Sequence, residues 1–149
     1  MDQRDDVHRT QAVAANQATW ALLERDDLPP DDATDLLRCA FASAYHWARA
    51  ADRGPEHDVR ADHLIAKSYV KLGNATEALR HAQRCLAGAT AAGLVDFDLA
   101  YAHEAMARAQ ALAGDTEGSL ASWRAARAVP IADPEDQAIL DADLADAPL

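Results

Sequence analysis

Apolar residues recur every three or four positions along most of the chain, and the clearest case is the 64–86 stretch. Ile65 and Tyr69 lie on one helical face before Gly73, and small apolar residues follow the same spacing after it. This periodicity is typical of amphipathic helices. Glycine adopts a positive φ at low cost, and an asparagine beside it can cap the next helix. The stretch therefore predicts two helices that fold back on one another at Gly73–Asn74.

The same periodicity, interrupted by prolines and glycines, predicts helices along the whole chain. The expected units are three helix pairs and a short final helix, at 5–53, 55–93, 96–130 and 134–145. Asp31 or Asp32 is expected to cap the second helix, and Asp96 the fifth. No alternating run of strand length occurs in the sequence. We therefore expect one all-α domain of about six helices plus a short C-terminal capping helix.

Composition supports a helical domain and limits the partners it can have. Half of the residues are hydrophobic but only 5% are aromatic, because alanine, the strongest helix former, supplies much of the apolar content. The formal net charge is −11, which repels nucleic-acid phosphates and anionic membrane surfaces. The sequence shows neither a bilayer-spanning run nor an apolar signal region, so a cytoplasmic location is expected by elimination. The richness in alanine, arginine and aspartate suggests a bacterial genome.

A short pattern occurs twice, once around Gly73 and again around Gly114, 41 residues later. Each copy has the turn glycine, a polar capping residue, an acidic residue, a small residue and then a leucine. Helix pairs that recur at such a period indicate a stacked helical array, in which neighbouring pairs bury each other's apolar faces.

These residues resemble the tetratricopeptide repeat in a long-helix form. The family's small, aromatic and turn-glycine positions fall on Ala66, Tyr69, Gly73, Ala78, Ala82 and Cys85, then on Ala107, Gln110, Gly114, Ser119, Trp123 and Ala126. The sequence departs from the family in two ways. Its period is 41 residues, whereas the family's is usually 34, and Asp62 and His103 stand where the family has a tryptophan. The resemblance covers 59–131 and implies antiparallel helix hairpins stacked as a short α-solenoid.

The resemblance also implies a partner-binding groove along the first helix of each pair. Its residues would be Arg60, His63, Lys67, Val70, Tyr101, Glu104 and Arg108. Arg60, His63 and Lys67 share one helical stripe. A basic stripe on an acidic protein favours a protein or peptide partner that is acidic or bears a carboxylate. The alternative is a solvated face on which Lys67 pairs with Glu104 or another nearby acid.

A second set of polar residues could meet at one end of the array. It comprises His46, Trp47, His63, Asp96, Asp98 and His103, with Tyr101 and Glu104 beside them. Histidine with carboxylate suits a metal or acid–base chemistry, but no His-Glu-x-x-His or comparable motif is present. Cys39 and Cys85 lack metal-binding or redox spacing and are expected to pack as free thiols. We therefore expect no metal, no cofactor and no catalytic residue.

The sequence thus favours a non-enzymatic protein–protein interaction module. One alternative is a small-molecule-binding, metal-binding or catalytic helical protein that uses the end cluster. Another is a structural homo-oligomer, because so short an array leaves terminal apolar surfaces to cover.

Overall fold

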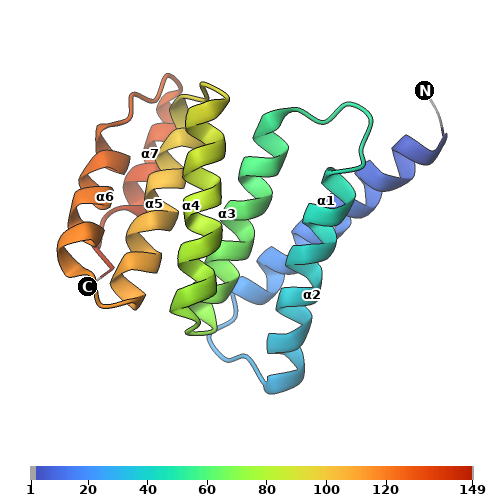
Figure 1. The fold of residues 1–149 in the computed structure, drawn as a ribbon, viewed down its shortest axis with the longest axis horizontal. Coiled ribbons are helices and arrows are strands. Elements are labelled where there is room, and N and C mark those ends of the chain that lie inside the picture. Colours follow the sequence, from blue (N-terminus) through green and yellow to red (C-terminus); the bar gives the residue numbers. More distant parts are fainter. Residues whose placement is uncertain (1–2, 149) are drawn as a thin grey trace.

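The computed structural model describes residues 3–148, and in this range the chain forms α-helices and no strand (Figure 1). The helices are α1 (Gln3–Leu23), α2 (Pro30–Trp47), α3 (Pro55–Lys71), α4 (Ala75–Ala91), α5 (Asp96–Leu112), α6 (Thr116–Ala128) and α7 (Pro134–Asp143). The prediction of an all-α fold is therefore confirmed.

Two turns of the same design connect α3 to α4 and α5 to α6. Gly73 and Gly114 adopt φ values of +76° and +83°, the left-handed conformation that glycine accepts most easily. The Asn74 side chain then accepts a hydrogen bond from the backbone N–H of Glu77, and Asp115 caps α6 in the same way. The predicted turn and the predicted asparagine cap are thus both present.

Two predicted aspartate caps differ from the structure. Pro29 occupies the capping position of α2 without a side-chain bond, while Asp31 and Asp32 lie in the first turn and favour the positive end of the helix dipole. Asp96 is the first residue of α5, with φ +58°. Its carboxylate accepts hydrogen bonds from the N–H groups of Phe97 and Ala132, at 2.7 and 2.9 Å. Asp96 therefore joins the start of α5 to the segment before α7.

The core is built mainly from alanine, which allows neighbouring helices to approach closely. Apolar clusters connect α3 to α4 and α5, and α5 to α6 and α7. Their buried members are Val59, Ala66, Ala78, Ala82, Cys85, Ala89, Ala100, Ala102, Ala105, Ala107, Ala109, Trp123, Ala126, Val129, Leu140 and Leu144. Figure 1 shows α1 and α2 at one end of the molecule, α3 and α4 in the middle, and α5 to α7 at the other end.

Candidate functional site

A cavity of about 550 Å³ opens between α1, α3, α5 and α7. Trp20, Phe97 and Tyr101 give it three aromatic walls, and the buried side chains of Val59 and Cys85 contribute apolar surface. A concave, mostly apolar site with a few polar groups is the usual form of a binding pocket.

Part of the predicted partner-binding groove borders this cavity, namely Arg60, His63, Lys67 and Tyr101. The helical spacing of the first three residues places them on one face of α3. Val70 packs instead against the apolar cluster between α3, α4 and α5. Glu104 is buried and Arg108 is bonded to it, so these two residues support the cavity wall rather than line the cavity.

The carboxylate of Glu104 is only 1% exposed and is surrounded by three basic side chains. His63 Nε2 lies 3.1 Å from Oε2 and donates to it, Lys67 Nζ lies 3.7 Å from Oε1, and Arg108 Nε donates to Oε1. Burial by itself raises the pKa of Glu104, but the His63 hydrogen bond and the neighbouring cations outweigh burial and lower the pKa from 4.5 to about 2. Glu104 is therefore an ionised counter-ion at neutral pH.

The other cations of the predicted stripe are also paired. Arg60 Nε and Nη2 donate to the two carboxylate oxygens of Asp98 at 2.7 and 3.0 Å, and this hydrogen bonding raises the pKa of Arg60. Lys67 faces Glu104, as the alternative interpretation expected, and its Nζ lies 5.8 Å from the ring centre of Trp20. Each of these cations is therefore already balanced by a carboxylate. Arg60 nevertheless stays 58% exposed, so its guanidinium can be reached from solvent.

Two further titratable groups at the cavity are held in their neutral forms. Burial, together with a hydrogen bond to Asp143, raises the pKa of Tyr101. Burial and nearby carboxylates raise the pKa of the Cys85 thiol to about 12, and its Sγ donates to the carbonyl oxygen of Val59 at 3.3 Å. A thiol becomes a nucleophile only as the thiolate, so Cys85 is chemically inert at neutral pH.

The residues of the predicted end cluster do not come together in one site, and they contact different partners in the structure. His46 Nδ1 lies 2.8 Å from His8 Nδ1, and Trp47 stacks on His57 with 4.2 Å between ring centres. His103 is half-buried, and burial lowers its pKa. The other members make the contacts described above. Among the side chains described, those of residues 7–148, no group of three or more from His, Cys, Asp or Glu is arranged to hold a metal ion.

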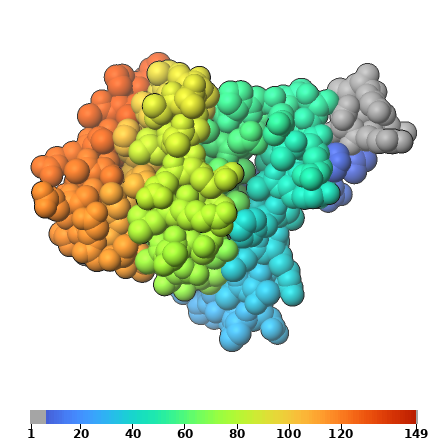
Figure 2. Space-filling view, in the orientation of Figure 1, coloured from blue at the N-terminus to red at the C-terminus, as the bar shows by residue number. Residues whose placement is uncertain are grey.

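A second polar pair, which was not predicted from the sequence, lies at the hollow between α2 and α4 (Figure 2). His81 Nδ1 lies 2.9 Å from Asp62 Oδ1, and the buried Nε2 has no hydrogen-bond partner in the described part of the chain. The rings of Phe41 and Tyr69 pack against the imidazole. Asp62 and His81 belong to different helices and no known motif, so no local signal predicts their contact.

The last helix, α7, contributes Ile139 and Asp143 to the lining of the main cavity, and this contribution was not predicted from the sequence. Asp143 is anchored there, because its carboxylate accepts from Tyr101 and its backbone oxygen accepts from Arg108. The last helix therefore completes the cavity in addition to covering the end of the core.

No family model, curated protein or solved structure matches this chain. Among the helices described, none combines the length and the apolar character that crossing a membrane requires.

Proposed function

We propose that the protein is a non-enzymatic protein–protein interaction module, built as a short tetratricopeptide-like array of antiparallel helix pairs. The contact between His63 and Glu104 is the observation that most directly supports the stacked array of this proposal. The two residues are 41 positions apart, the same separation as Gly73 and Gly114. They therefore occupy equivalent positions in consecutive helix pairs. Contact between equivalent positions is expected when successive units stack in the same register.

The partner would be an extended segment of a protein that places one large apolar or aromatic side chain in the 550 Å³ cavity. Asn16 on α1 lines this cavity, and in the described chain its amide makes no hydrogen bond, so it can serve the partner's backbone. The exposed edge of the Arg60 guanidinium can donate hydrogen bonds to a carboxylate of the partner. The partner thus bears a carboxylate, but apolar contact in the cavity supplies most of the binding energy.

The charges around the cavity favour binding over catalysis. General acid–base catalysis works best with a pKa near the working pH. The pKa of Glu104 is far below neutrality, and the pKa values of Cys85 and Tyr101 are raised. These groups hold the wall of the site in one arrangement and have little capacity to exchange protons with a ligand at neutral pH.

A random peptide library displayed on phage, selected against the immobilised protein, tests the proposal. We expect selected peptides to share a large apolar residue. By fluorescence anisotropy, Asn16→Trp should weaken their affinity at least about tenfold, because the indole occupies the cavity. Gln11→Trp, at an exposed position on the same helix, is the matched control and should bind as the unmodified protein does. Peptides that bind Asn16→Trp equally well would show that this cavity is not the site.

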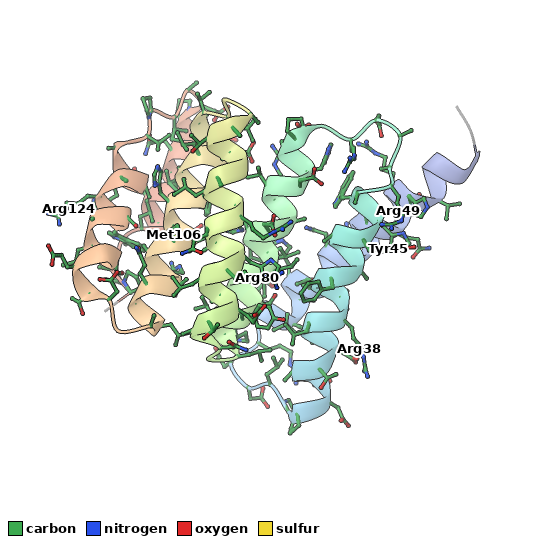
Figure 3. The ribbon with its side chains drawn as sticks, in the orientation of Figure 1. Arg38, Tyr45, Arg49, Arg80, Met106 and Arg124 are labelled. Carbon is green, nitrogen blue, oxygen red and sulfur yellow. The ribbon has the colours of Figure 1, made fainter. Side chains whose placement is uncertain are left out.

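The carboxylate contact has its own test. Arg60→Gln should weaken the binding of those selected peptides that carry a carboxylate, and it should remove part of the salt dependence of that binding. Arg80→Gln is the control, because Arg80 lies on α4 and lines none of the cavity (Figure 3). Lys67 is a poorer probe, since its replacement also disturbs buried Glu104. Equal effects of both arginine substitutions would indicate general charge attraction and would remove Arg60 from the proposed site.

A further inference from the structure

The packing of α1 against α2 brings two histidines together, outside the proposed groove. In the buried seam between these helices, Ser43 Oγ donates to the carbonyl oxygen of Ala12 at 3.0 Å. One helical turn earlier than Ala12 lies His8, and about one turn later than Ser43 lies His46. Their Nδ1 atoms are 2.8 Å apart, and their ring centres are 5.1 Å apart. The seam therefore points two imidazole nitrogens at one another.

An aromatic ring and a guanidinium pack beside the histidine pair. The ring of Tyr45 stands edge-on to both imidazoles, and Arg49 lies over that ring, 3.6 Å from its centre. Tyr45 and Arg49 are both visible on the face shown in Figure 3. A neutral imidazole presents a nitrogen lone pair to a metal ion, whereas an imidazolium does not.

We propose that His8 and His46 form a two-histidine site for a divalent transition metal, Cu²⁺ or Ni²⁺, whose remaining positions are filled by water. With metal–imidazole bonds of about 2.0–2.1 Å, a right angle at the metal separates the two nitrogens by about 2.9 Å, and a tetrahedral angle separates them by about 3.3–3.4 Å. The observed 2.8 Å fits the right angle. Tetragonal geometry with imidazole ligands is characteristic of Cu²⁺ and Ni²⁺, and Cu²⁺ is the tighter-binding of the two.

Binding at this site requires both imidazole rings to turn, so that each Nδ1 lone pair is directed at the metal instead of at the other ring, and it requires a proton rearrangement. In the neutral pair, one Nδ1 carries a proton and the other accepts it. When the metal takes both Nδ1 lone pairs, that proton moves through solvent to Nε2 of the same ring. If the pair carries an extra proton, the extra proton is released to solvent. The bound ion then ties α1 to α2, so it should stabilise the folded protein against heat.

Titration calorimetry of the full chain with CuCl₂, without a polyhistidine tag, tests the proposal. We expect binding of one Cu²⁺ per chain and an increase in melting temperature. His8→Ala and His46→Ala should each lower the affinity for Cu²⁺ about tenfold or more, because the loss of a group that only supports a metal ligand already lowers metal affinity by this factor. His103→Ala, which removes a histidine outside the pair, should bind as the unmodified protein does.

Electron paramagnetic resonance of the Cu²⁺-loaded unmodified protein provides a measurement that does not depend on how the variants fold. Two imidazole nitrogens should split the copper signal. Cu²⁺ affinity that both alanine variants retain, or a signal without two-nitrogen splitting, would overturn the proposal. His46→Asn separates the metal from the hydrogen bond, since asparagine can still bond to His8 but is a poor ligand for Cu²⁺.

Discussion

Replacing Glu104 with glutamine should cost the folded protein about 3 kcal/mol at neutral pH. Lowering its pKa from 4.5 to about 2 means that folding favours the ionised carboxylate by about this much, at 1.36 kcal/mol per pKa unit. Removal of one partner from a buried ion pair typically costs about 3–5 kcal/mol, which agrees in size. The loss arises because Lys67 and Arg108 keep their charges beside an uncharged amide. It is a large part of the 5–15 kcal/mol that usually stabilises a domain.

Urea unfolding followed by far-UV circular dichroism gives this free energy directly. The exposed first-turn residue Glu117 provides the control, and Glu117→Gln should change stability little. A neutral result for Glu104→Gln would refute the reasoning, because it would mean that the carboxylate is not needed to balance the surrounding cations.

The pH dependence of the same variant tests the sign of the effect. The folded-state pKa of Glu104 is lowered, so its carboxylate contributes fully to the free energy of unfolding above pH 4.5. This contribution is lost as the pH falls from 4.5 towards 2. The difference in stability between Glu104→Gln and the unmodified protein should therefore be largest at neutral pH and should shrink over this acid range. A difference that stays constant in acid would show that the cost comes from packing rather than from charge.

Three further predictions concern the turns and the thiols. Gly73→Ala should cost about 1 kcal/mol in urea unfolding, because φ is +76° there, and Gly73→Asn should cost less; equal costs would argue against a backbone origin. Asp96→Ala should lower the free energy of unfolding by about 2 kcal/mol, because the variant loses two hydrogen bonds to the carboxylate and keeps a residue with a side chain at φ +58°. Asp96→Asn should recover part of this loss. An alanine variant as stable as the unmodified protein would contradict the role given to the Asp96 carboxylate. Cys39 should react with a thiol reagent well before Cys85, which is fully buried, and the reverse order would contradict the assigned burial.

Part of the candidate site could be predicted because it depends on position along one helix. Arg60, His63 and Lys67 share a face through their spacing alone, and the 41-residue period places Arg108 in the position that corresponds to Lys67. The structure brings Lys67 and Arg108 to the same carboxylate. The burial of Glu104 was not predicted, because it depends on how closely α3 and α5 approach, and sequence spacing does not give that distance.

The sequence by itself determined the helices and their turns. Apolar periodicity and the residues Gly73, Asn74 and Gly114 act over a few neighbouring positions, where backbone sterics and local hydrogen bonds dominate. Tertiary structure alone decided which distant side chains meet, such as His8 with His46 and Tyr101 with Asp143. These contacts depend on the angle and register at which alanine-rich helices pack, which many small contacts set together. No single stretch of sequence carries that information.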